Sequence, residues 1–261
     1  MIITESFVFL NYPKTGSTFV REALSELYAN APTRHWPWRK KRHFEMYMAP
    51  NVRDVSPMRA GSPNPHGTYW QIPKRARHLP VYSVFRDPLE RVISAYYYAD
   101  WKRQEGALAE LDTIKQKYPS FPDLGILDYL EYLHCFYPRK LSVGGEIFGT
   151  LATDFVHFFL REVEKENQKT FNFSSLMDLQ DSMGHVCFLD NSNLNQELAD
   201  MLLKHGYGND DVLFIREKSK SNVSKKSNTD IHHEMKEIVR RSLSDDMALI
   251  QKIVRVPVKK K

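Results

Sequence analysis

The sequence predicts an α/β fold in which helices flank a central, mainly parallel sheet. Short runs rich in β-branched and aromatic residues alternate along the chain with longer amphipathic segments, a pattern typical of this fold class. Hydrophobic residues make up 42% of the chain and aromatic residues 12%, which is enough to bury a core. We expect the 261 residues to form one domain, residues 1–261, with a disordered basic tail at 255–261.

The first βα unit is predicted at the start of the sequence. MIITESFVFLNYPK lacks the features of a signal peptide and is typical of a buried strand, which we place at Ser6–Leu10. Asn11-Tyr12-Pro13 then favours a turn. In the segment after KTGST, apolar residues recur at helical spacing, at Phe19, Ala23, Leu24 and Leu27.

The later elements follow from the same periodicity. Residues 30–65 predict a long irregular segment with a short helix near Phe44–Met48. Val81–Phe85 predicts a strand, and Pro88 suits the first position of the helix after it. Residues 104–125 are expected to form an exposed insertion. The remaining predictions are helices at Ile126–Phe136 and Thr153–Glu166, a strand at Val186–Leu189, a helix at Asn193–His205, a basic loop at Lys218–Asn228 and a last helix from Thr229 to Val254.

Composition narrows the classes of function. The formal net charge of +5 is modest for a nucleic-acid-binding protein but suits an anionic ligand. The chain has only two cysteines, Cys135 and Cys187, which argues against a disulfide scaffold or a zinc site. The sequence does not exclude a single disulfide bond between them. No apolar run approaches the roughly 20 residues that span a bilayer, so we expect a cytoplasmic protein without a membrane span.

The segment YPKTGST lies between a predicted strand and a predicted helix. Gly16 allows a tight turn, and the helix start offers backbone N–H groups that attract an anion. Lys14 adds a positive charge, while Thr15, Ser17 and Thr18 add hydroxyl groups. The Walker A pattern places its lysine after the second glycine, whereas Lys14 precedes Gly16, so a standard ATPase or GTPase is disfavoured. The segment therefore predicts a site for one phosphate group.

A second phosphate site is predicted in VYSVFRDPLERVISAYYY. Arg86 follows a strand, at the edge where α/β sheets present ligand-binding groups. Ser94 lies eight residues later, about two helical turns on, and so faces a similar side. Arginine can hold a phosphate with two parallel hydrogen bonds, and serine adds a hydroxyl.

Together these two segments resemble the sulfotransferases that use 3′-phosphoadenosine 5′-phosphosulfate (PAPS). The closest resemblance is to the carbohydrate and uronyl 2-O-sulfotransferase branch and to bacterial sulfotransferase-like proteins. It implies a P-loop-kinase-like sheet, with PAPS as the donor and no metal. YPKTGST resembles the family's 5′-phosphosulfate loop, and FRDPLERVISAYY its 3′-phosphate motif. The implied donor-binding residues are Lys14, Thr15, Gly16, Ser17, Thr18, Phe19, Arg86 and Ser94, with Lys14 also catalytic. Asn222 and Ser224 are similar to a loop that closes over the nucleotide, or belong to a solvated basic loop.

Transfer to a hydroxyl group benefits from a general base. His66, in PNPHGTYW, is the first candidate, because this stretch resembles an HG-containing segment of the uronyl branch. That branch carries a second histidine where this chain has Thr68. Glu45 is the alternative base, because related branches place a glutamate between the two phosphate motifs.

The acceptor is the least determined part of the prediction. The resemblance favours a carbohydrate, and the cations and tryptophans of Arg34–His43 suit either a glycan or an exposed basic loop. A protein tyrosine or a small-molecule alcohol stays open as the acceptor. Two other classes also stay open: an atypical nucleotide or sugar kinase, and a non-catalytic nucleotide-binding module.

Overall fold

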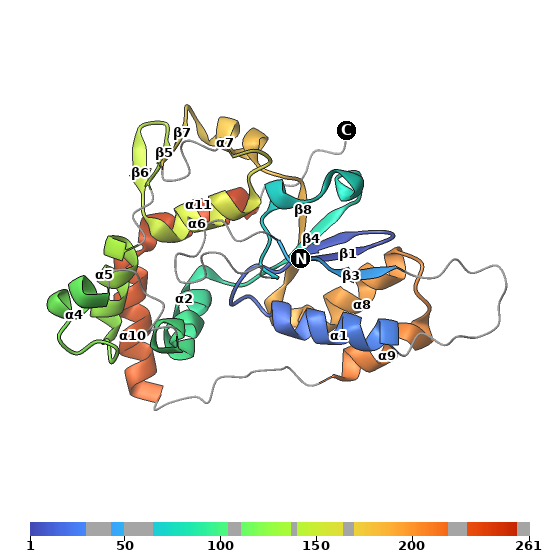
Figure 1. Ribbon diagram of the computed structural model, residues 1–261, viewed down its shortest axis with the longest axis horizontal. Helices are drawn as coiled ribbons and strands as arrows, with labels where there is room; N and C mark the ends of the chain where they lie inside the picture. Colours follow the sequence, from blue (N-terminus) through green and yellow to red (C-terminus); the bar gives the residue numbers. More distant parts are fainter. Residues whose placement is uncertain are drawn as a thin grey trace. The chain divides into compact units, whose positions relative to one another are not determined.

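The computed structural model describes seven stretches of the chain, which are residues 1–29, 43–49, 65–103, 111–136, 140–163, 170–218 and 229–254. They fold into two compact units, each with its own sheet (Figure 1). The first unit holds the described residues of Met1–Ala49, Asn64–Arg86 and His185–Val223, and the second holds those of Asp87–Gly184 and Ser224–Lys261.

The sheet of the first unit is mixed. Its strand order is β3-β1-β2-β4-β8. Strands β2, β4 and β8 run parallel, while β1 is antiparallel to both β2 and β3. The α/β class is therefore confirmed, but a mainly parallel sheet is not. The bounds are β1 Ile2–Thr4, β2 Val8–Leu10, β3 Phe44–Met46, β4 Val81–Phe85 and β8 Val186–Asp190.

A tight turn explains why the N-terminal run is two strands instead of the one that we predicted. The Thr4 hydroxyl donates to the Phe7 carbonyl oxygen at 2.9 Å and accepts from the N–H groups of Ser6 and Phe7. These bonds satisfy the backbone where the chain reverses. The reversal lets β1 pair antiparallel with β2.

The prediction of a short helix near Phe44–Met48 was wrong. Phe44–Met46 forms the edge strand β3, in which Glu45 pairs with Ile3 of β1. The pairing joins residues more than 40 positions apart, so local periodicity carries no signal for it.

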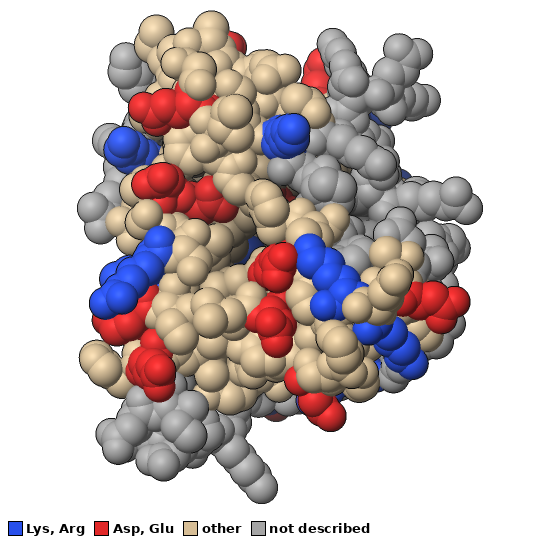
Figure 2. Space-filling model, turned by 90° about the vertical axis from the view of Figure 1, so that its left-hand side faces the viewer, with Lys and Arg blue, Asp and Glu red and all other residues tan. Residues whose placement is uncertain are grey.

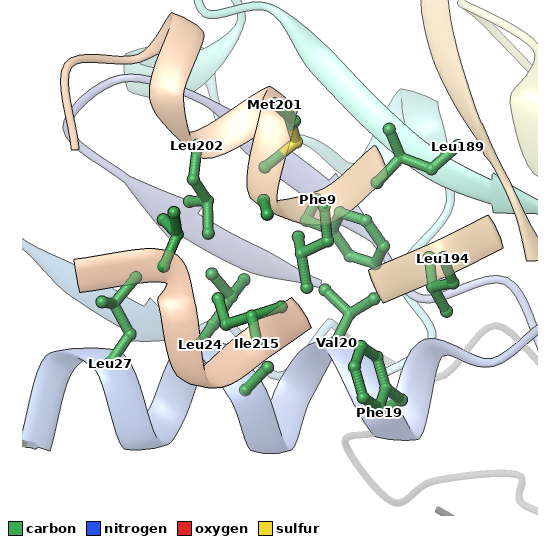
Figure 3. Packing of buried hydrophobic residues seen from close by; sticks show 14 of the residues in the cluster. Phe9, Phe19, Val20, Leu24, Leu27, Leu189, Leu194, Met201, Leu202 and Ile215 are labelled. Atoms are coloured by element: carbon green, nitrogen blue, oxygen red, sulfur yellow. The ribbon is translucent and has the colours of Figure 1, made fainter. Parts of the chain in front are cut away.

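One hydrophobic core supports the first unit. Helices α1 (Ser17–Ala29), α8 (Leu194–Lys204) and α9 (Asn209–Glu217) pack together with the sheet. Figure 3 shows Val20 and Leu24 of α1 beside Ile215 of α9. The three side chains are fully buried in a cluster that also contains Phe9 of β2, so apolar packing positions α1 relative to the sheet. Helix α8 confirms the predicted Asn193–His205 to within one residue at each end.

The second unit contains a small sheet that the sequence did not predict. Its order is β6-β5-β7, with β5 antiparallel to β6 and parallel to β7. Helix α6 contacts β5, and helix α7 contacts β7. Asp246 of α11 accepts from the N–H groups of Gly149 and Ala152 at the start of α6. The elements are α2 Pro88–Tyr98, α3 Asp100–Arg103, α4 Leu111–Lys117, α5 Ile126–Phe136, β5 Lys140–Val143, β6 Glu146–Phe148, α6 Thr150–Phe159, β7 Thr170–Phe173, α7 Leu176–Ser182, α10 Thr229–Ser242 and α11 Ser244–Val254.

Several predictions in the second unit need correction. The expected exposed insertion at 104–125 contains α4, and its later part is buried through Ile114, Tyr118, Phe121 and Leu124. Helix α6 ends at Phe159 because Leu160 is extended and bridges Met183. The last predicted helix is two helices, α10 and α11. The strand at Val81–Phe85, the helix at Ile126–Phe136 and the helix start at Pro88 are confirmed.

The surface carries charges of both signs. On the face in Figure 2, the described acidic and basic side chains lie interspersed. Among the residues described, no helix combines the length and apolar character that crossing a membrane requires. Cys135 and Cys187 are both free thiols.

Candidate functional site

The candidate site lies at the carboxyl ends of the three parallel strands of the first unit. Asn11 directly follows β2, Arg86 follows β4 and Asn191 follows β8. Because parallel strands end at the same sheet edge, the three residues belong to one edge, where open α/β sheets bind ligands. The Lys14 loop, residues 11–17, begins at this edge and leads into α1.

The backbone of the Lys14 loop is unusual at two positions. Lys14 has φ 65° and Gly16 has φ 104°, both in the left-handed region. For a non-glycine residue this conformation costs about 1–3 kcal/mol and persists only where surrounding contacts enforce it. Left-handed residues in such turns direct successive N–H groups toward one side, as in anion-binding nests.

Side chains hold the carbonyl groups of the loop. The Arg86 Nη1 donates to the Lys14 carbonyl oxygen at 3.3 Å, and the Asn191 Nδ2 donates to that of Thr15 at 2.7 Å. The Thr15 hydroxyl donates to the Tyr12 carbonyl oxygen at 2.8 Å. A carbonyl oxygen carries a partial negative charge and repels an anion. Because these carbonyl oxygens are hydrogen-bonded to protein donors, they point away from a ligand bound at the loop.

The start of α1 supplies N–H groups. The first backbone bond of the helix runs from the Val20 N–H to the Gly16 carbonyl oxygen, at 3.5 Å. The N–H groups of Ser17, Thr18 and Phe19 precede this bond and so have no partner in the helical ladder. These N–H groups and the positive dipole end of α1 favour an oxyanion, and the half-buried Lys14 precedes them by three residues.

Asn191 is a site residue that the sequence analysis missed. It lies immediately after β8, and an added Cβ at Gly16 would be 2.5 Å from its Nδ2 atom. Its amide therefore both bonds the loop and fills the space next to Gly16. The rule that selected Arg86, a polar residue after a parallel strand, also applies to Asn191.

The structure places His66 next to the Lys14 loop. Its Nδ1 lies 2.7 Å from the Asn11 carbonyl oxygen, and the Asn11 Nδ2 donates to the Pro65 carbonyl oxygen at 3.0 Å. A carbonyl oxygen only accepts, so Nδ1 carries the hydrogen. In the neutral ring, Nε2 then carries the lone pair that a general base needs.

Close packing fixes the backbone after His66. An added Cβ at Gly67 would be 2.5 Å from the Met1 Cε and 2.8 Å from the Ala49 Cβ. Glycine is required here because the backbone approaches these side chains closely. His66 is therefore held both by Asn11 and by the packed residue that follows it.

Glu45, the alternative base, lies at a different part of the sheet. It pairs with Ile3, which pairs with Val8, so Glu45 is two strands and three residues from Asn11. These steps correspond to about 10 Å across and about 10 Å along the sheet. Arg75 donates to both carboxylate oxygens at 2.8 and 2.7 Å, and these hydrogen bonds lower the pKa of the Glu45 carboxyl. A carboxylate bound in this way is a weaker base.

Three predicted donor-binding residues lie outside the described part of the first unit. Ser94 is a half-buried residue of α2, in the second unit. Asn222 and Ser224 lie outside the described residues. Their roles stay predictions from the sequence.

Searches of protein-family models and of curated proteins find no match to this chain. The functional argument therefore depends on the residues and their geometry.

Replacing Gly16 by alanine tests how tightly the loop is constrained. Gly145 is the matched control, because it has φ 88° and no atom within 4 Å of an added Cβ. Both variants should lose about 1–2 kcal/mol of unfolding free energy from the left-handed backbone. Gly16→Ala should lose a further 1–3 kcal/mol, roughly, because its Cβ overlaps Asn191. Urea unfolding followed by circular dichroism measures both, and equal losses would show that the Asn191 contact imposes no constraint.

Proposed function

We propose that the protein transfers a sulfuryl group from PAPS to a hydroxyl group on a carbohydrate. The observation that carries this proposal is the Lys14 loop, in which Arg86 and Asn191 hold the carbonyl groups of Lys14 and Thr15 directly before the N–H groups that begin α1. The family resemblance of YPKTGST and FRDPLERVISAYY supports the choice of PAPS among phosphate-bearing ligands.

Lys14 and Arg86 have distinct roles in this proposal. The loop and Lys14 bind the 5′-phosphosulfate, and Arg86 binds the 3′-phosphate of the same nucleotide. The Arg86 side chain donates to the Lys14 carbonyl oxygen, and this proximity supports the proposal that one nucleotide contacts both residues. Ser94, Asn222 and Ser224 are assigned to the donor by resemblance alone.

The chemistry is an in-line displacement at sulfur. His66 Nε2 accepts the proton of the acceptor hydroxyl while its oxygen bonds to sulfur. The bond between sulfur and the phosphate oxygen breaks, and adenosine 3′,5′-bisphosphate leaves with the electron pair. Lys14 and the α1 N–H groups stabilise the charge that develops on the phosphosulfate oxygens. Lys14 thus serves both binding and catalysis.

Replacing Lys14 by alanine tests the catalytic proposal. Transfer from labelled PAPS to a panel of glycans, phenols and peptides should fall by about 10²-fold or more, because a preorganised charge is lost. The control is Lys204→Ala, which removes an exposed lysine at the end of α8. Circular dichroism checks that both variants fold. Wild-type rates in Lys14→Ala would rule out this role, and magnesium-dependent ATP turnover would favour a kinase.

The general base is tested by replacing each candidate with glutamine, which is not a base. His66→Gln should reduce kcat by about 10²-fold or more, the usual contribution of a positioned base. Glu45→Gln should leave kcat within a few-fold, because Arg75 already neutralises Glu45 and the residue lies away from Asn11. Steady-state kinetics with labelled PAPS distinguish the two, and the reverse pattern would make Glu45 the base.

A further inference from the structure

The side chains of Lys117 and Cys135 are in direct contact within the second unit. Lys117 is the last residue of α4, and its Nζ donates to the Cys135 Sγ of α5 at 2.9 Å. The Lys117 Nζ also lies 2.9 Å from the Glu131 Oε1. Glu131 is four residues before Cys135, so both project from one face of α5. A carboxylate and a thiol on this face thus share one amine.

Buried aromatic residues hold the two helices at this contact. Tyr118 directly follows Lys117, and Tyr132 lies between Glu131 and Cys135; both tyrosines are buried. Their rings pack edge to face, with centroids 6.5 Å apart. The backbones that carry Lys117 and Cys135 are therefore kept close together by core packing as well as by their own hydrogen bond.

Both members of the pair are exposed to small molecules in solvent. Hydrogen bonding to Cys135, and then to Glu131, raises the pKa of the Lys117 amine, which is therefore an ammonium group at neutral pH. A neighbouring ammonium favours the thiolate form of a cysteine, and the thiolate is the form that attacks a peroxide. The contact thus combines a nucleophilic sulfur with a proton donor.

Cys187 provides a comparison within the same chain. It is also an exposed free thiol, in strand β8 of the first unit. Among the described residues, no lysine or arginine is hydrogen-bonded to its sulfur. The amine of Lys117 therefore distinguishes the environment of Cys135 from that of Cys187.

We propose that Lys117 and Cys135 form a modification site for peroxide, at which oxidation joins the Lys117 nitrogen to the Cys135 sulfur as a sulfenamide. The Cys135 thiolate attacks one oxygen of hydrogen peroxide, so an S–O bond forms and the O–O bond breaks. The leaving hydroxide takes a proton from the Lys117 ammonium, which gives water, a sulfenic acid and a neutral amine. The amine then attacks sulfur, the S–O bond breaks, and hydroxide leaves as water with the amine proton.

The geometry favours this second step over competing reactions. The sulfur is oxidised by two electrons, and one peroxide is reduced to two molecules of water. The Lys117 Nζ is already 2.9 Å from the sulfur, whereas a second thiol must arrive from solution. The product is a covalent link between α4 and α5, and its formation does not depend on sulfuryl transfer.

Treating the full chain with hydrogen peroxide tests the proposal. Peptide mass spectrometry should find a peptide that joins α4 to α5 and is lighter than its two parts by two hydrogen atoms; dithiothreitol should separate them. Lys117→Arg keeps the positive charge but replaces the amine, so the joined peptide should be lost entirely and dimedone should label Cys135 as the sulfenic acid. Lys115→Arg, which changes another exposed lysine of α4, is the matched control and should keep the link.

The wild-type protein gives a second readout, because Cys135 should be oxidised several-fold faster than Cys187. Equal rates at the two thiols would overturn the proposal. So would a Cys135 that is labelled by dimedone without any joined peptide, or one that forms a disulfide-linked dimer instead. A joined peptide that persists in Lys117→Arg would also contradict it, because another amine would then be the partner.

Discussion

Hydrogen bonds from side chains to the carbonyl groups of one short loop are the constraint on which the candidate site depends. Arg86, Asn191 and the Thr15 hydroxyl restrain the loop in which Lys14 and Gly16 adopt positive φ, so removing these bonds would release the loop. The loop would then relax, and its carbonyl oxygens would compete with any anion for the N–H groups. The strain at Lys14 and the bonds that maintain it are two parts of one arrangement.

The core of the first unit makes this arrangement possible. Arg86 and Asn191 come from different strands, and only a rigid sheet edge can hold both near the loop. Val84 of β4 belongs to the same buried cluster as Leu189 of β8 and Val20 of α1. Figure 3 labels Leu189 and Val20. Apolar packing thus sets the distances, and polar groups after the strands then act over them.

Local patterns predicted local features well. Val81–Phe85, the helix start at Pro88 and the loop between β2 and α1 all follow from periodicity and turn chemistry. Pairings between distant segments had no such signal, so β3, the N-terminal hairpin and the small second sheet were missed. The same limit applies to the candidate site. Lys14, Arg86 and His66 were selected from separate segments, but the sequence could not show that Asn11 contacts His66 or that Asn191 bonds to Thr15. It also could not show that β3 places Glu45 away from Asn11.

The most direct test of the central claim is calorimetry with two nucleotides that differ by one phosphate. Adenosine 3′,5′-bisphosphate should bind Arg86→Ala more weakly than wild type by about 1.5–3 kcal/mol, the contribution of a hydrogen bond to a charged group. Adenosine 5′-phosphate, which lacks the 3′-phosphate, should be affected much less. If both nucleotides lose affinity equally, Arg86 acts only by holding the loop, and if the bisphosphate does not bind wild type at all, the loop is not a nucleotide site.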